Sequence, residues 1–263
     1  MHQITTLEAM LRRDRGIVLV GLAVITLLAW VYIVYLAQEM KTGMAIGSNM
    51  AMPLMQSWGA VDFALMFVMW AVMMTAMMVP TAAPMILVYA SLNRKRRDPQ
   101  PLFNSTAVFL LGYLVIWSGF AALATVAQWS LHIGALLSPM MVSASPILGG
   151  ALLMAAGIFQ LTPIKYACLA NCRTPIGFLM TEWRDGPRGA LVMGLRHGLS
   201  CLGCCWVLMG LLFVLGVMNL LWIAALAGFV LVEKVAPRGH LVSRLSGLML
   251  IGWSGWVVLE TLG

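Results

Sequence analysis

Residues 189–215 read GALVMGLRHGLSCLGCCWVLMGLLFVL, a stretch with one formally charged side chain, Arg196, and three cysteines near its middle. A helix needs about 20 apolar residues to cross the roughly 30 Å hydrocarbon core of a bilayer, and this stretch is long enough. The chain as a whole is also apolar, because 62% of its 263 residues are hydrophobic and only 10% are charged. The sequence therefore predicts an integral membrane protein.

Seven apolar stretches qualify as transmembrane helices, and they predict an all-α bundle that forms a single domain over residues 1–263. The stretches cover about residues 17–37, 60–85, 106–128, 146–164, 189–215, 217–234 and 241–262. The second one continues as an apolar run to about residue 92, which is too long for one straight span. We expect Pro80 and Pro84 to kink this span or to mark its exit, because each proline removes a backbone donor.

The positions of Lys and Arg set the expected orientation, because basic residues in short connections are retained on the cytoplasmic side. Fourteen of the 16 basic residues precede the first predicted helix or lie in every second connection after it. The N-terminus is therefore expected in the cytoplasm and the C-terminus outside. This distribution accounts for the net charge of +7 without a nucleic-acid partner. Glu233 and Lys234, at the end of the sixth predicted helix, are expected to reach interfacial water or the cytoplasmic connection.

The cysteine-containing helix carries a stripe of soft ligands. At 100° per residue, Met193, His197, Cys201, Cys204 and Cys205 fall within about 120° of one another. Thiolate and imidazole are common ligands of Cu(I) and Zn²⁺, so the stripe predicts a metal site near the middle of the bilayer. The alternative is that these cysteines are only small buried hydrophobic residues. Nearby glycines, at 194, 198 and 203, would allow another helix to approach closely.

Two further cysteines, Cys168 and Cys172, are four residues apart and would share one helix face if the fourth helix continues past Pro163. We expect them at the cytoplasmic surface, where they would form an exit or sensor site for the metal. The alternative is a pair of ordinary reduced thiols, because the cytoplasm disfavours disulfides.

Methionine supplies a second group of soft ligands, since 12 of the 22 methionines lie between Met40 and Met85. On the second helix they include a one-sided ladder that begins near Asp62, and others fall in the preceding external connection. Thioethers favour Cu(I) among the common metal ions. The alternative is that methionine packs the core. The ladder consists of Met66, Met69, Met73 and Met77; the external residues are Met40, Met44, Met50, Met52 and Met55.

Residues 70–84, WAVMMTAMMVPTAAP, and residues 194–206, GLRHGLSCLGCCW, resemble the bacterial family described as predicted metal-binding integral membrane proteins. The similarity spans about residues 58–235 and includes Cys168 and Cys172. The resemblance implies a metal-binding protein of the bacterial inner membrane, and it implies neither a particular metal nor an activity.

These patterns favour a protein that binds a soft metal, with Cu(I) first and zinc as the alternative, for transport, storage or delivery to a partner complex or metallochaperone. External methionines would collect the ion, the ladder would relay it, and the Cys/His cluster would hold it. One alternative is a thiol redox protein in which Cys201 and Cys204 form a disulfide. Another is an accessory or assembly subunit of a larger membrane complex. Because neither a catalytic triad nor a phosphate-binding loop is evident, the sequence favours binding over catalysis.

Overall fold

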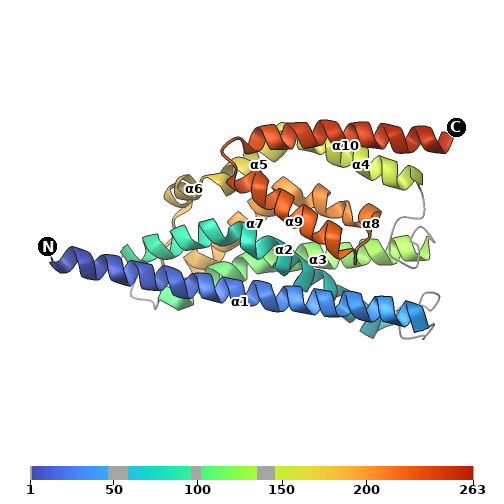
Figure 1. The fold of residues 1–263 in the computed structure, drawn as a ribbon. Helices are drawn as coiled ribbons and strands as arrows, with labels where there is room; N and C mark the ends of the chain where they lie inside the picture. Colours follow the sequence, from blue (N-terminus) through green and yellow to red (C-terminus); the bar gives the residue numbers. More distant parts are fainter. Residues whose placement is uncertain (1, 47–58, 96–101, 135–145, 263) are drawn as a thin grey trace.

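The computed structural model describes residues 2–46, 59–95, 102–134 and 146–262, and 92% of the structure is helical. Figure 1 shows the longer helices running roughly along one direction, with the two termini at opposite ends of the bundle. The predicted all-α class is confirmed. The helices are α1 (His2–Ile46), α2 (Ala60–Lys95), α3 (Leu102–Ile133), α4 (Pro146–Gln160), α5 (Pro163–Arg173), α6 (Pro175–Glu182), α7 (Gly186–Gly210), α8 (Leu212–Leu215), α9 (Leu220–Val235) and α10 (Gly239–Leu262).

Five of the described helices are long and apolar enough to cross a membrane, which supports an integral membrane protein. A sixth span exists if α4 and α5 count as one, although the chain bends by 64° between them. The 16-residue α9 is shorter than these candidates. The five spans are Arg13–Met40, Ala60–Arg94, Asn104–Ile133, Gly186–Leu215 and Gly239–Glu260.

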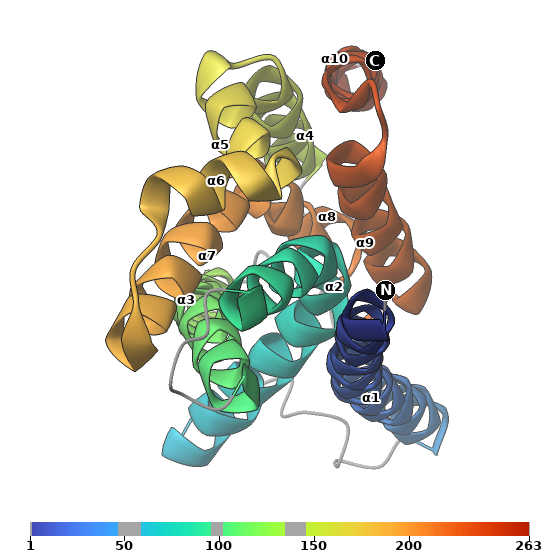
Figure 2. The same ribbon diagram turned by 90° about the vertical axis from the view of Figure 1, so that its left-hand side faces the viewer.

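The helices form two groups that meet at α7. The most extensive helix contacts join α3 to α7, α1 to α2 and α2 to α3, while α4 pairs with α10. Figure 2, which looks along the bundle, shows α4 and α10 next to each other and α1 at the opposite edge. Because α7 also contacts α5, it can place its side chains between the two groups.

Small residues allow α3 and α7 to approach at backbone distance. A Cβ atom built on Gly194 would lie 2.1 Å from the Phe109 carbonyl oxygen, and one built on Gly112 would lie 2.5 Å from the Leu191 carbonyl oxygen. No side chain fits at either position without moving a helix backbone. The expectation of close helix contact at the glycines of α7 is therefore confirmed at Gly194.

Pro80 and Pro84 stand inside α2 and do not end it, because the helix continues to Lys95. Neither proline therefore ends the helix, and the expectation that they kink the span or mark its exit stays a prediction. At the other end, the Gly59 N–H donates to the Asp62 carboxylate at 2.8 Å, which fixes the start of the helix.

The break between α4 and α5 follows from the sequence at Thr162 and Pro163. Pro163 cannot donate to a preceding carbonyl, so it is accommodated at the first position of a new helix. The Thr162 hydroxyl accepts a hydrogen bond from the Lys165 N–H at 3.3 Å, as an N-cap does. The chain therefore turns here, and α5 does not extend the line of α4.

Candidate metal centre

The five cysteines lie in one region, where α5 packs on α7. Cys201, Cys204 and Cys205 are buried on α7, with at most 1% of each side chain exposed. The buried Cys172 thiol of α5 interacts with the thiols of Cys201 and Cys204. None of the five is in a disulfide within the described structure. Thiols from two helices that are separate in the sequence therefore converge.

Cys168 and Cys172 do not form a site apart from the α7 thiols, and their place at the cytoplasmic surface stays a prediction. Cys172 is buried against the thiols of α7, and Cys168 is half-buried with its sulfur against Gly203, where an added Cβ would lie 2.7 Å away. The physical reason is the bend at Pro163, which turns α5 onto α7 instead of letting it continue outward.

Cys201 has the most polar surroundings of the five thiols. The ammonium of Lys234, from α9, donates to the Cys201 sulfur at 3.0 Å and to the Thr81 hydroxyl of α2 at 2.8 Å. Lys234 is 6% exposed, so its charge is removed from solvent. A buried ammonium is stable only with polar or anionic partners, and a thiolate at Cys201 would supply the negative charge.

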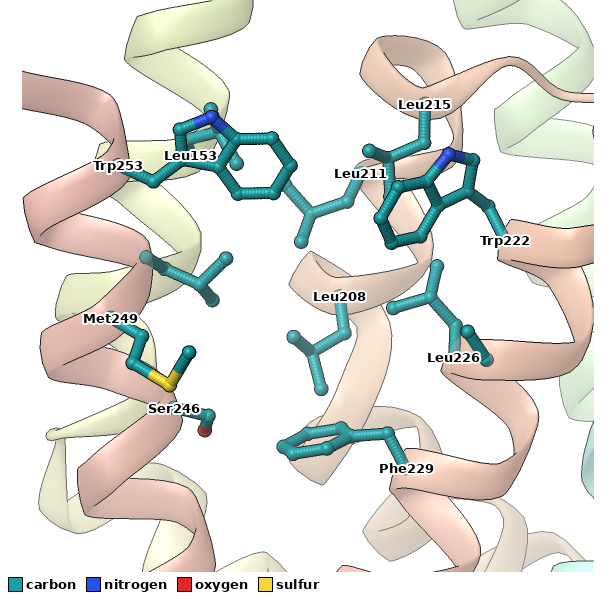
Figure 3. A pocket seen from close by; sticks show the side chains of 12 residues that line it. Leu153, Leu208, Leu211, Leu215, Trp222, Leu226, Phe229, Ser246, Met249 and Trp253 are labelled. Carbon is teal, nitrogen blue, oxygen red and sulfur yellow. The ribbon is translucent and has the colours of Figure 1, made fainter. Parts of the chain in front are cut away.

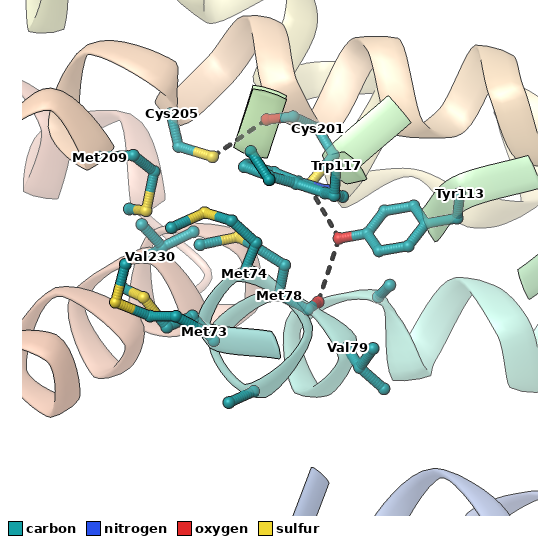
Figure 4. Packing of buried hydrophobic residues seen from close by; sticks show 14 of the residues in the cluster. Met73, Met74, Met78, Val79, Tyr113, Trp117, Cys201, Cys205, Met209 and Val230 are labelled. Carbon is teal, nitrogen blue, oxygen red and sulfur yellow. Dashed lines mark hydrogen bonds between the residues drawn. The ribbon is translucent and has the colours of Figure 1, made fainter. Parts of the chain in front are cut away.

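Tyr113 of α3 contacts the same sulfur from another side. Its hydroxyl lies 3.1 Å from the Cys201 sulfur and 3.0 Å from the Met78 carbonyl oxygen (Figure 4). Because the phenol has one proton, it can donate to only one of these two acceptors at a time. The contacts of Tyr113, Lys234 and Thr81 thus join α2, α3 and α9 around one thiol of α7.

The other two thiols of α7 are held locally. The thiols of Cys204 and Cys205 both donate to the Cys201 carbonyl oxygen, at 3.0 Å each. These are weak hydrogen bonds to the preceding helical turn, so losing them costs little free energy if a metal ion binds the sulfur instead. Cys204 and Cys205 therefore retain sulfur lone pairs that a metal ion can use.

His197 lies one turn before Cys201 in an aromatic enclosure. Its ring stacks near Phe109 and Tyr113 and meets the edge of Phe178, with centroid distances of 5.6–6.2 Å. The Nδ1 atom is buried and has no hydrogen-bond partner among the described residues. His197 thus has a free nitrogen near the thiols, and its role as a ligand stays a prediction.

No group of three or more His, Cys, Asp or Glu side chains within the described ranges is already arranged to hold a metal ion. Two thiolates are sufficient for Cu(I), which readily accepts two ligands, whereas structural Zn²⁺ sites almost always have four. The choice between Cu(I) and zinc at these thiols stays a prediction.

The methionine ladder on α2 is buried. Met66 is 7% exposed, and Met69, Met73 and Met77 are at most 1% exposed. Figure 4 shows the side chains of Met73, Met74 and Met78 on α2 facing those of Cys205 and Met209 on α7. Burial alone is also what core packing requires, so the relay stays a prediction. Of the external methionines, Met50, Met52 and Met55 lie outside the described residues, as does the side chain of Met44, and Met40 belongs to α1.

A second buried polar cluster lies beside the thiols. The Lys165 ammonium donates to both oxygens of Glu233, at 2.8 and 2.9 Å, and also to the Gln160 side-chain oxygen. The Ser243 hydroxyl donates to Glu233 at 2.7 Å. Because Lys165 and Glu233 are at most 1% exposed, the expectation that Glu233 reaches interfacial water is wrong. The neighbouring α9 residues Glu233 and Lys234 therefore make contacts in two different polar groups.

Lys234, Tyr113 and the Lys165–Glu233 pair lie at or beside the site, and the sequence patterns did not predict them there. The pattern of positive charges predicts Lys234 in a basic connection and gives no reason to place it inside. A useful signal was present, however: Glu233 and Lys234 are adjacent at the end of an otherwise apolar helix. Ionisable residues within a membrane span are rare and are candidates for function by default.

A cavity of about 510 Å³ between α4, α7, α9 and α10 does not contain the thiols. Figure 3 shows it lined by leucine and aromatic side chains, with Ser246 and Met249 on one wall. One hydroxyl and one thioether do not make a metal site. The thiol cluster is therefore the better candidate.

A family model described as copper chaperone, PpoB2, matches residues 67–257, which is well over half of the chain. The matched range includes all five cysteines, His197, Lys234 and most of the methionine ladder. Comparisons with curated proteins and with solved structures give no match.

We expect the Lys165→Met variant to lose about 3–5 kcal/mol of stability, because it leaves the Glu233 charge buried without its partner. The double variant Lys165→Met/Glu233→Gln removes both charges and should be less destabilised than the single variant. Thermal unfolding of the detergent-purified proteins, analysed as a double-mutant cycle with Glu233→Gln, measures this coupling. Additive effects in the cycle would show that the two side chains do not depend on each other.

Proposed function

Because the chain belongs to the PpoB2 copper chaperone family, we propose that it binds Cu(I) within a membrane at the thiols shared by α5 and α7 and delivers it to a partner. The observation that carries this proposal is the convergence of Cys172, Cys201 and Cys204 in a buried region next to Lys234. Thiolates select Cu(I) because both partners are soft.

Cys201 and Cys204 are the proposed thiolate pair, and Cys172, whose thiol interacts with both across the helix interface, is the proposed third donor. Cys205, Cys168 and the unpartnered Nδ1 atom of His197 are further donors that the ion can use during entry or release. Exchange between two- and three-ligand arrangements would let the protein hold the ion and still pass it on.

Lys234 has a specific electrostatic role in this proposal. A Cu(I) ion with two thiolates forms a centre with one net negative charge, and burying that charge without compensation is costly. The Lys234 ammonium, already 3.0 Å from the Cys201 sulfur, would neutralise it. The centre and its counter-charge together would then be neutral.

The methionine ladder would supply the ion. The ladder follows one face of α2 and consists of Met66, Met69, Met73 and Met77. Between α2 and Cys205 of α7, further thioethers come from Met74 and Met209. Neutral thioethers bind Cu(I) more weakly than thiolates, so an ion on this path would move toward the cysteines. Burial of the ladder among other core residues supports a path inside the protein.

The topology in this proposal has seven spans, with α4–α5 as one broken span and α9 as a short one, an N-terminus in the cytoplasm and a C-terminus outside. An odd number of spans requires the termini at opposite ends, which is how Figure 1 shows them. Basic residues from distant segments also gather at one end: Arg94 pairs with Asp14, and Arg173 donates to the Ala236 carbonyl. This supports that end as the cytoplasmic one.

Purified protein loaded with Cu(I) under reducing conditions should retain about one ion per chain. The Cys201→Ser/Cys204→Ser variant should retain almost none, because a hydroxyl is a poor ligand for a soft ion. Elemental analysis after desalting measures the copper content. Ser200→Ala, a change in the same turn of α7 that leaves the thiols intact, is the control. Equal copper in the double variant and the wild type would remove these thiols from the proposed site.

The Lys234→Met variant should bind Cu(I) about tenfold more weakly, because the buried negative centre loses its counter-charge, and Lys234→Arg should recover part of the affinity. Competition with a coloured Cu(I) chelator gives the dissociation constants. Arg188→Gln, which removes an exposed positive charge at the start of α7, should change affinity less than twofold. The proposed role of Lys234 fails if Lys234→Met and Arg188→Gln behave alike.

The Met69→Leu/Met73→Leu variant should load Cu(I) several-fold more slowly from the external side of membrane vesicles, with unchanged copper content at equilibrium. Leucine keeps the volume of methionine but removes the thioether, so the core should stay packed. Loading time courses in right-side-out and inverted vesicles separate the two directions. Met180→Leu/Met249→Leu, at two exposed positions, is the matched control. Identical external loading rates for both variants would rule out the ladder as the entry path.

A further inference from the structure

A second pocket, of about 540 Å³, lies where α5 meets the first turns of α10. Tyr166 and Arg173 line it from α5, and they lie about 140–160° around that helix from Cys168. Its described lining contains none of the proposed copper ligands. The pocket is therefore distinct from the thiol cluster, on the opposite face of the same helix.

The pocket concentrates positive charge. Arg173, Arg244 and His240 line it, and the described lining contains no acidic residue. Arg173 donates through one terminal nitrogen to the carbonyl oxygens of Ala236 and Pro237, at 2.5 and 2.8 Å. These neutral acceptors hold the side chain in place but leave its positive charge uncompensated.

Arg244 is held by a different contact, but its positive charge is also uncompensated. Its guanidinium carbon lies 5.8 Å from the centroid of the Tyr166 ring, in a cation–π contact. Arg244 has no hydrogen-bond or ion-pair partner in the part of the chain that the structure describes. The Tyr166 hydroxyl oxygen is likewise buried without a hydrogen-bond partner there. Several donors around this pocket are thus unused.

Two guanidinium groups that share a pocket repel each other unless an anion lies between them. Each guanidinium presents a planar fork of N–H groups that matches the oxygens of a phosphate, and Arg173 keeps its other nitrogens for such a contact. From this geometry we propose that the pocket binds a phosphate group, carried either by the headgroup of an anionic lipid or by a soluble phosphate.

The place of the pocket in the bundle suits a membrane surface. His240 and Arg244 lie within the first two turns of α10, next to the α9–α10 turn that Arg173 contacts. This is the end of the protein at which basic residues gather. Basic pockets between helices on the cytoplasmic side are known to hold lipid headgroups. The inference does not depend on copper binding, because none of the copper ligands is involved.

The test uses the full-length protein in a neutral detergent. It is titrated with phosphatidylglycerol, with zwitterionic phosphatidylcholine and with inorganic phosphate, and binding is followed by native mass spectrometry for the lipids and by thermal shift for phosphate. We expect saturable binding of phosphatidylglycerol or of inorganic phosphate, and the one that binds identifies the source. Arg244→Gln should raise the dissociation constant about tenfold, and Arg244→Lys should raise it less, because charge remains but the fork is lost.

Arg188→Gln is the matched control, since it removes an exposed arginine from the same end of the protein but outside the pocket. It should change the dissociation constant less than twofold. Size-exclusion elution and thermal unfolding of Arg244→Gln protein check its fold, and His240→Gln repeats the test if that variant does not fold. The proposal is overturned if neither phosphate source binds saturably, or if Arg188→Gln and Arg244→Gln weaken binding equally, because the attraction would then be a diffuse effect of surface charge.

Discussion

The contact between the Lys234 ammonium and the Cys201 sulfur constrains the centre of this protein more than any other interaction. A cation in an apolar interior is stable only if its partners are fixed around it, and here the partners come from different helices. Thr81 of α2 takes one N–H of Lys234, and Tyr113 of α3 reaches the same sulfur. The position of α9 therefore depends on the positions of α2, α3 and α7 together.

The adjacent Glu233 extends this constraint to the rest of the bundle. Its carboxylate pairs with Lys165 of α5 and accepts from Ser243 of α10. Glu233 thus connects α9 to α5 and α10, and the adjacent Lys234, with the opposite charge, connects it to α2 and α7. These contacts fix the position of the 16-residue α9 against its neighbours, and removing one partner of a buried charge would be costly. It also joins the α5 helix, which carries Cys172, to the same element that places Lys234 beside Cys201.

The sequence predicted the all-α class and the soft-ligand stripe because both depend on local properties, hydropathy and a period of 3.6 residues. It also placed Met69 and Met73 on one face of α2, where both are buried.

The sequence did not predict that the chain turns at the Thr162–Pro163 break. A proline after an apolar run is compatible with a kink, an exit or a new helix, and only tertiary packing selects among these. The contact of Cys172 with the α7 thiols was not predicted for that reason. Lys234 and Glu233 were misplaced because charge counts assume that ionisable residues at helix ends reach water, whereas partners from α2, α5 and α7 can hold them inside.

In the proposed copper site, the thiols that would bind and release the ion are divided between two helices. Cys201 and Cys204 belong to α7, which the Gly112 and Gly194 contacts hold at backbone distance from α3. Cys172 belongs to α5, an 11-residue helix that starts at a break in the chain. If all ligands were on one rigid helix, release would require each metal–sulfur bond to break without help from the fold. In the proposed copper site one ligand would lie on a separate short helix, so a small displacement of α5 would remove that ligand first and lower the affinity of the remaining pair for the ion. This arrangement would make tight binding compatible with transfer in the proposed site.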